Sequence, residues 1–276
     1  MPEGDSVHRL AARLRRAADG RLVVDGELRS GASSGTQLAG LRVLEHDTHG
    51  KHLLTRFSGG LTLHTHLRMQ GSWTVTSPGR VVPRSVQKDV RVRLRLDDGV
   101  TLWGVDLPVV ELVPTREEDL VVGHLGPDPL RTDWSAQEAV RRLSHDPGRP
   151  VVAALLDQRL VAGLGNLWAN EVCFLRGAWP WRPIGSVDVP ALVATAARGL
   201  RASVTVPGMF QTTTGDTRRG ERHWVAGRAG RPCLRCGTTI LVRAEVAGDP
   251  ERRRTWWCPH CQPEPAPSGD GGGTSA

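Results

Sequence analysis

Residues 90–105, VRVRLRLDDGVTLWGV, decide the fold of the first half of the chain. Valine and leucine alternate with arginine at the start, so one face of an extended strand is apolar and the other is polar. The Asp98-Gly99 pair predicts a tight turn into a second strand. We therefore expect an antiparallel hairpin with one buried face, which is typical of a β-sandwich or a β-barrel.

Strand patterns of this kind extend from residue 21 to about residue 113, and Gly59-Gly60 joins two more strands in the same way. A helix precedes them, because apolar residues recur at helical spacing from Ser6 to Ala18. Ser6 is placed to act as the N-cap of this helix. The sequence thus predicts a β-sandwich that begins with one amphipathic helix.

The pattern changes after residue 130, where apolar spacing becomes helical. Four helical segments are predicted, at residues 133–145, 150–160, 166–176 and 189–203. A cysteine-bearing module follows, and then a tail rich in proline, glycine and serine that we expect to be disordered. The predicted fold is α+β and multidomain, with a β-sandwich domain at 1–120, a linker at 121–132, a helical domain at 133–228, a zinc finger at 229–262 and the tail at 263–276.

The composition limits the classes of partner. A net charge of +7 and a pI near 10 favour a polyanion. No run of 18 uncharged apolar residues exists, so neither a membrane span nor a membrane partner is expected. The first ten residues, MPEGDSVHRL, lack the apolar centre of a signal peptide, which predicts a cytoplasmic protein.

Four of the five cysteines form two pairs, Cys233-x2-Cys236 and Cys258-x2-Cys261, with 21 residues between them. In a cytoplasmic protein this pattern indicates metal ligation and not disulfides. Four thiolates complete a tetrahedral Zn²⁺ site with no open position, so we expect one structural zinc ion. The remaining cysteine, Cys173, fits the buried face of a helix.

The segment between the cysteine pairs predicts a hairpin with a turn at Gly248-Asp249-Pro250 and a basic second strand. A closed zinc site beneath such a hairpin would hold the arginines at 252–254 toward a phosphate backbone. A solvated loop is the alternative explanation for this run of charge.

Residues 151–174, VVAALLDQRLVAGLGNLWANEVCF, predict two helices joined by a glycine turn. Gly163 and Gly165 permit unusual backbone angles, and Asn166 is placed to cap the second helix. Free amides at that helix start would form an anion site suited to a DNA phosphate. An ordinary helical hairpin is the alternative.

Three motifs carry a family resemblance: Pro2-Glu3-Gly4 before a helix, LLDQRLVAGLGNLWANE at 155–171, and WVAGRAGRPCLRCG at 224–237 with TWWCPHCQ at 255–262. Together they resemble the Fpg/Nei DNA glycosylases, and endonuclease VIII (Nei) more closely than Fpg. The match runs in the same order from residue 2 to residue 262. It implies an N-terminal antiparallel β-sandwich, a helix–two-turn–helix domain, a zinc-finger hairpin and a DNA-binding cleft.

The resemblance also implies a bifunctional DNA glycosylase and AP lyase of base excision repair with Pro2 as nucleophile. Removal of Met1 would expose a secondary amine with a pKa near 8, so a useful fraction is unprotonated at neutral pH. The amine can attack C1′ of a damaged nucleoside, displace the base and form an iminium ion that permits β- and δ-elimination. Glu3, next to the amine, is the expected proton shuttle.

Further roles follow from the resemblance. Lys51, one of two lysines among 36 basic residues, matches the family's catalytic lysine, which contacts phosphate and assists opening of the sugar ring. Asn166 and Arg253 match residues that bind phosphates around the lesion, and Glu171 matches an acidic residue near the flipped base. A chance surface lysine at 51 and a solvated helical glutamate at 171 are the alternatives.

A damaged base must leave the duplex before it is attacked, and the gap has to be filled. The loop LRMQG at 67–71 lies where the family places its void-filling residues, which predicts that Arg68 and Met69 contact DNA. The alternative places Met69 in the core between two strands.

The sequence departs from the family at some points. Ser6 stands where a second glutamate is usual, which leaves proton transfer at the lesion open. Residues 105–120 contain no Arg-x-Phe pair like that of the opposite-strand loop of Fpg. Residues 211–222 are a candidate lesion-recognition loop, but nothing in them identifies the base.

We therefore expect a monomeric, nucleoid-associated enzyme that acts on damaged duplex DNA and prefers oxidised pyrimidines. The nearest alternative is an Fpg-like glycosylase for oxidised purines. A non-catalytic damaged-DNA-binding zinc protein and a zinc-finger transcription regulator are alternatives from other classes. The presence of Pro2, Glu3 and Lys51 argues against a non-catalytic protein.

Overall fold

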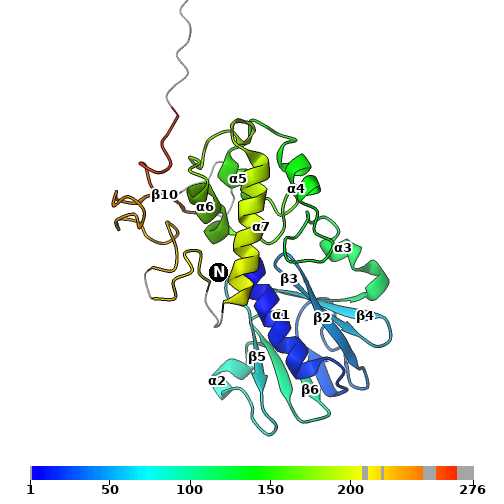
Figure 1. The fold of residues 1–276 in the computed structure, drawn as a ribbon. Helices are drawn as coiled ribbons and strands as arrows, with labels where there is room; N and C mark the ends of the chain where they lie inside the picture. The colour runs from blue at the N-terminus through cyan, green and yellow to red at the C-terminus, as the bar shows by residue number, and fades with distance from the viewer. Residues whose placement is uncertain (1, 207–210, 219–220, 245–252, 266–276) are drawn as a thin grey trace, which may run out of the picture.

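The computed structural model describes residues 2–206, 211–218, 221–244 and 253–265 (Figure 1). The predicted turn at 248–250 and the tail from residue 266 onward lie outside the described residues. Figure 1 shows two β-sheets at one end of the molecule, a group of helices at the other, and the cysteine-bearing module beside the helices. The predicted α+β multidomain class is confirmed.

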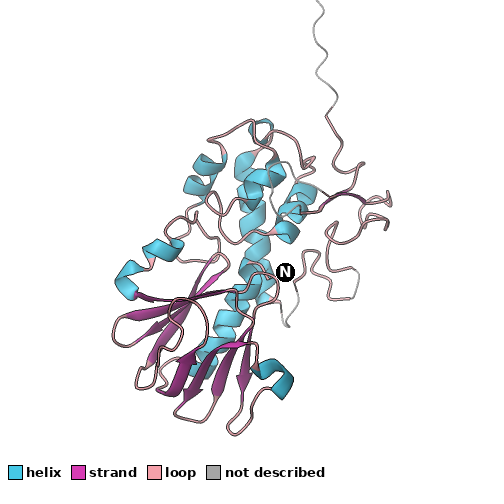
Figure 2. Ribbon diagram, turned by 180° about the vertical axis from the view of Figure 1, so that it is seen from behind, coloured by secondary structure: helices cyan, strands magenta, loops and turns pink. Residues whose placement is uncertain are grey.

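Two four-stranded antiparallel sheets form the N-terminal sandwich, seen from behind in Figure 2. Their inner faces share one apolar core, to which Phe57 and Leu63 contribute from one sheet and Leu94 and Leu102 from the other. One sheet has the order β1 (Val23–Leu28), β6 (Val90–Leu96), β7 (Thr101–Val105), β5 (Ser72–Thr76), and the other β2 (Val43–His49), β3 (His52–Phe57), β4 (Leu61–His66), β8 (Val109–Pro114).

The hairpin predicted from residues 90–105 is β6–β7. The apolar residues of β6 are all buried and its arginines are not, as the alternation requires. The turn brings Leu94 opposite Leu102, and Gly99 adopts a φ of 82°, a left-handed conformation that glycine adopts without steric cost. The Gly59-Gly60 hairpin between β3 and β4 is also confirmed.

Helix α1 (Gly4–Ala18) packs on the sandwich through Val7, Leu10 and Leu14. The prediction that Ser6 caps this helix is wrong, because the helix begins two residues earlier and Glu3 occupies the cap position in an extended conformation. The backbone carbonyl of Glu3 accepts the first helical hydrogen bond, from the amide of Val7 at 3.0 Å. The side chain of Glu3 is therefore free to bind elsewhere.

The second half contains the four expected helices, with the first two shorter than predicted. Pro150 stands at the N-cap of α5, and Asp157 leaves the helical region at its end, which limits that helix to six residues. The buried Trp168 and Leu200 belong to the core of this helical part. The helices are α4 (Ala136–Leu143), α5 (Val151–Leu156), α6 (Asn166–Leu175) and α7 (Val189–Thr205).

Short elements that the sequence did not predict complete the fold. The helix α2 (Arg84–Gln87) follows β5, while the 3-10 turn η1 (Thr115–Glu117) and α3 (Asp119–Val122) lead out of β8. A second 3-10 turn, η2 (Ile184–Ser186), precedes α7. None of the helices in the described ranges is long and apolar enough to cross a membrane.

The C-terminal module contains a small antiparallel pair, β9 (Leu241–Arg243) and β10 (Thr255–Trp257). The two strands are the ends of the hairpin predicted between the cysteine pairs. Phe174 of α6 belongs to the apolar cluster that includes Cys233 and Cys258, so the module packs directly on that helix.

Candidate active site and four-cysteine cluster

Three segments that are distant in sequence meet at the start of α6. The amide of Gly4 donates to the carbonyl of Gly163 at 2.9 Å, and a Cβ on Gly4 would lie only 2.8 Å from Cα of Gly163. Gly50, in the turn before β3, would place a Cβ 3.1 Å from the Gly163 nitrogen. The chain start, the turn that carries Lys51 and the glycine turn therefore approach at backbone distance, which only glycine allows.

The carboxylate of Glu3 binds the N-terminus of α6. It accepts hydrogen bonds from the amides of Gly165 at 2.8 Å, Leu167 at 2.8 Å and Trp168 at 3.2 Å. A negative side chain suits this position because the first amides of a helix have no partner within the helix and carry the positive end of its dipole.

Two predictions about this helix start are corrected by the geometry. Gly165 occupies the N-cap position that we assigned to Asn166, and Asn166 is the first helical residue. Amides that we expected to bind a DNA phosphate instead bind Glu3. The sequence could not predict this, because the carboxylate comes from the other end of the chain.

Glu3 has no solvent-exposed surface. Burial raises the pKa of its carboxyl above the ordinary value, although the charge of Lys51 and hydrogen bonds from two α6 amides act in the opposite direction. A carboxyl whose pKa is raised holds a proton more readily than an ordinary one, which suits a group that gives and takes protons.

A pocket of about 320 Å³ has Glu3 among its lining residues. Its size falls within the range of small-molecule sites, roughly 300–1,000 Å³. Met69 lines it and is 67% exposed, so the alternative that placed Met69 in the core is excluded. The lining residues are Glu3, Met69, Asn166, Leu167, His223, Ala226, Gly227 and Trp256.

The other predicted DNA contacts lie around this pocket. Asn166 donates from Nδ2 to the carbonyl of Arg254 at 2.9 Å, which ties the start of α6 to the segment that enters β10. Arg253 is the neighbouring residue on that segment and is partly buried. Arg68 is exposed and adopts a φ of 45°, a strained conformation for a residue with a side chain.

The turn that carries Lys51 is held by a buried carboxylate that we did not predict. Asp128, in the segment after α3, accepts from the amides of Gly50 at 2.7 Å and Leu130 at 2.8 Å. Burial raises the pKa of Asp128, and these two hydrogen bonds oppose the shift. Asp128 therefore couples the Lys51 turn to the connection between the two halves of the chain.

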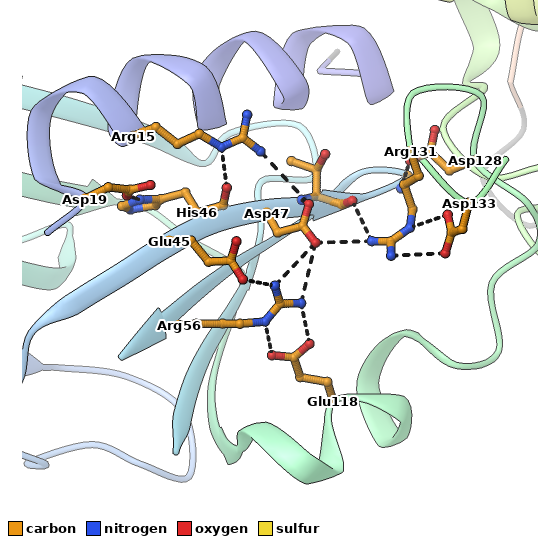
Figure 3. A network of polar contacts seen from close by, with 12 residues as sticks. Arg15, Asp19, Glu45, His46, Asp47, Arg56, Glu118, Asp128, Arg131 and Asp133 are labelled. Atoms are coloured by element: carbon orange, nitrogen blue, oxygen red, sulfur yellow. Dashed lines mark hydrogen bonds and ion pairs between the residues drawn. The ribbon is translucent and has the colours of Figure 1, made fainter. Parts of the chain in front are cut away.

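Figure 3 shows that this anchor continues into a network of ion pairs along β2 and β3. Arg131 lies 3.3 Å from Asp47 and also donates to the carbonyl of Thr48 at 3.2 Å. Arg56 contacts Glu118 through two nitrogens, each at 2.7 Å. The bidentate Arg56–Glu118 pair and the two contacts of Arg131 tie the strand pair to the segment that follows β8.

Glu171 is fully buried, so the alternative of a solvated glutamate is excluded. Its carboxylate accepts from the amides of Trp224, Val225 and Ala226, each at 2.8 Å, and from the hydroxyl of Thr213. These contacts hold the segment that forms one wall of the pocket. Glu171 therefore shapes the pocket through the backbone that it binds.

The four cysteines of the two predicted pairs lie together, with all four Sγ atoms within 4.8 Å of one another. Cys236 Sγ is 3.5 Å from both Cys258 Sγ and Cys261 Sγ. Thiolates arranged tetrahedrally around one zinc ion at about 2.3 Å would be about 3.8 Å apart, so the cluster fits that ion. Cys173 is separate from the cluster and buried in the helical core, as predicted.

The cysteine cluster is connected to the pocket wall by stacked side chains. The guanidinium of Arg235, between the first two cysteines, lies 4.4 Å from the ring centroid of Phe174. Phe174 in turn stacks on Trp224 with centroids 5.5 Å apart. The cysteine module, α6 and the segment around Trp224 thus form one packed unit.

Two family models match the chain. The formamidopyrimidine-DNA glycosylase N-terminal domain matches residues 1–108, and the formamidopyrimidine-DNA glycosylase H2TH domain matches residues 125–211. The first range contains α1 and the sandwich strands from β1 to β7, and the second contains the helices that surround the glycine turn.

Relatives that match nearly the whole chain belong to the same group of DNA-repair proteins as the two family models. The probable endonuclease 8 2 of Streptomyces coelicolor is 45% identical, over 97% of this chain and 96% of that protein. The DNA-(apurinic or apyrimidinic site) lyase Nei2 of Mycolicibacterium smegmatis is 40% identical, over 95% and 99%. The crystal structure of the MutM (Fpg) protein of Thermus thermophilus has a TM-score of 0.76 and 32% identity, over 96% of this chain and 100% of that one.

A Lactococcus lactis Fpg solved with DNA that contains an abasic site has the same fold, with a TM-score of 0.79 at 23% identity, over 95% of this chain and 100% of that one. The fold, and the contact of the chain start with the glycine turn before α6, define a DNA glycosylase of the helix–two-turn–helix class. The chain belongs to the formamidopyrimidine-DNA glycosylase family, and its relatives at 40–45% identity carry the names endonuclease 8 and Nei2 lyase.

The contact between Glu3 and α6 predicts the effect of a single methyl group. A Cβ on Gly165 would lie 2.4 Å from Cδ and Oε1 of Glu3, so Gly165→Ala must expel the carboxylate from its amides. Removing the partners of a buried charge costs about 3–5 kcal/mol, and we expect a loss of this size in the free energy of unfolding. Denaturant titration followed by circular dichroism measures it.

Gly148→Ala is the matched control, since its nearest neighbour would be 3.8 Å from the new Cβ. We expect a change within about 0.5 kcal/mol there. Equal stability of the two variants would contradict the burial of Glu3 on the α6 amides.

Proposed function

We propose that the chain is a bifunctional DNA glycosylase and AP lyase of base excision repair that removes oxidised bases and cuts the abasic site. The observation that carries the proposal is the placement of Glu3. Its carboxyl is buried on the α6 amides, burial raises its pKa while the charge of Lys51 lowers it, and Glu3 lines a pocket of about 320 Å³. Pro2 is its direct neighbour in the chain.

In the proposed reaction the amine of Pro2 forms a bond to C1′ while the bond from C1′ to the base breaks. Glu3 supplies or relays the proton that the leaving base needs. The nitrogen lone pair then breaks the bond from C1′ to the ring oxygen, which takes a proton through Glu3, and this ring opening gives the iminium ion. The iminium ion then acts as an electron sink, so loss of a proton from C2′ expels the 3′ phosphate, and a second elimination expels the 5′ phosphate. Lys51 would hold phosphate next to these steps.

DNA would lie across the pocket. Asn166 and Arg253 would bind phosphates around the lesion, and the exposed loop with Arg68 and Met69 would enter the base stack that the lesion leaves. The net charge of +7 favours such a partner. We infer that the enzyme acts on duplex DNA as a monomer, in the cytoplasm at the nucleoid. We divide the chain into a sandwich domain at 1–120, a linker at 121–132, a helical domain at 133–228 and a zinc finger at 229–262.

The four-cysteine cluster would hold one zinc ion with a structural role, since all four ligand positions are taken by protein thiolates. Within the reaction the module would act by placing Arg253 and by supporting the pocket wall through Arg235 and Phe174.

For the lesion class, oxidised pyrimidines are our first choice, because the relatives of greatest identity named above are endonuclease 8 proteins. An Fpg-like preference for oxidised purines is the second candidate, since both matching family models are those of formamidopyrimidine-DNA glycosylase. A binding protein without activity is disfavoured by the burial of Glu3 at the pocket, where the charge of Lys51 acts on its carboxyl.

Borohydride trapping tests the reaction. Full-length protein from which Met1 has been removed should form a covalent adduct with abasic duplex DNA, because reduction fixes the iminium ion on Pro2. Peptide mass spectrometry of the adduct should place the sugar on Pro2. Protein with extra residues before Pro2 is the control, since an amide nitrogen there cannot react. An adduct on Lys51, or none at all, would refute the proposed nucleophile.

Matched duplexes that carry thymine glycol or 8-oxoguanine test the lesion class. We expect a higher kcat/KM for thymine glycol by about tenfold or more, the factor that one well-placed polar contact supplies. Excision products separated on denaturing gels provide the rates. A clear preference for 8-oxoguanine would replace our first choice with the second.

Zinc content tests the metal site. Elemental analysis should give one zinc per chain, and Cys258→Ser should lose the ion and with it much of the affinity for DNA. Cys173→Ala, at the cysteine outside the cluster, should retain the ion. Zinc loss in the second variant and not in the first would contradict the assigned ligands.

A further inference from the structure

One pocket residue has a polar atom with no assigned role. His223 lines the same pocket as Glu3, and its Nε2 is buried. Within the described part of the chain, this nitrogen has no hydrogen-bond partner. A buried polar atom without a partner costs free energy, so its retention in a pocket wall indicates that a ligand group completes the bond.

The backbone on both sides of His223 is fixed. On the N-terminal side, the carbonyl of Arg222 accepts from the amide of Thr213 at 2.8 Å. On the C-terminal side, the amide of Trp224 donates to Glu171 at 2.8 Å. The Trp224 ring adds its own contacts, through the stack on Phe174 and a 3.3 Å hydrogen bond to the carbonyl of Thr213. His223 is therefore held in place before any ligand arrives, as a recognition group should be.

The surroundings of His223 identify the kind of ligand. Leu167, Ala226 and Trp256 give the pocket an apolar lining around the histidine. A neutral ring with polar edges suits such a mixture better than a phosphate, which needs several donors or cations. The imidazole offers one donor and one acceptor when neutral, so it can bind a carbonyl oxygen or a ring N–H of a nucleobase.

We propose that His223 is a specificity-determining residue whose Nε2 hydrogen-bonds to the edge of the extruded base. This inference rests on the proposed glycosylase function, and it names the side chain by which the pocket reads its substrate. Glu171 becomes the positioning residue for this contact, because its carboxylate holds the three amides that follow His223.

The two activities of the enzyme provide the test. An abasic site has no base, so a residue that reads the base matters for excision and not for cleavage of a preformed abasic site. We expect His223→Phe and His223→Ala to lower kcat/KM for thymine glycol excision about tenfold or more. Both variants should cleave, and be trapped on, abasic duplex DNA within about twofold of the unmodified protein.

His223→Gln provides the rescue, because its side-chain amide retains a donor and an acceptor and should recover part of the excision rate. His145→Ala is the matched control at an exposed histidine after α4, and it should leave both rates unchanged. Thermal unfolding and zinc content of every variant report on folding.

Each result decides a different claim. If His223→Phe and His223→Ala fold but excise the base at the normal rate, the inference is wrong while the proposed function stands. Equal losses on lesion and abasic DNA would also overturn it, since that outcome assigns His223 to the framework. Unmodified protein that neither excises a base nor cleaves an abasic site would instead overturn the proposed function itself.

Discussion

A buried carboxylate must find hydrogen-bond donors, and in this protein the donors that Glu3 finds are the first amides of a helix that begins more than half the chain away. Satisfying Glu3 through Gly165, Leu167 and Trp168 joins the sandwich to the helical part at one point. The neighbouring glycines make this possible, because Gly4 and Gly163 meet with no room for a side chain.

The turn with Lys51 is brought to the same point by a different set of forces. Asp128 binds the amide of Gly50, and Arg131 and Arg56 hold the strands that lead to it. The pairs are individually part-exposed and worth little alone. Their effect is geometric, because they hold the turn that carries Lys51. The charge of Lys51 lowers the pKa of Glu3, while burial raises it.

Sequence patterns predicted correctly those parts of the fold whose contacts lie between residues close together in the chain. The alternation in residues 90–105, the glycine turns at 59–60 and 98–99 and the cysteine spacing predicted the hairpins and the cluster correctly. The family motifs likewise placed Glu3, Asn166 and Met69 in one pocket. Side-chain partners across the chain were not predictable: Ser6 and Asn166 looked like helix caps only because the contact of Glu3 with α6 leaves no trace in local sequence. Glu171 was expected near the flipped base, but its binding of the amides at 224–226 could not be predicted, because that loop lies far along the chain. His223 had no local signal at all.

The separation between Glu3 and its donors has a consequence for the order in which the protein becomes able to work. A nascent chain emerges with Glu3 first, and until Gly165 to Trp168 have left the ribosome its carboxylate remains in water without the burial that raises its pKa. The last wall of the pocket, which includes Ala226 and Trp256, is synthesised later still. A truncated or stalled product would thus carry the proposed Pro2 nucleophile without the pocket that places a base against it.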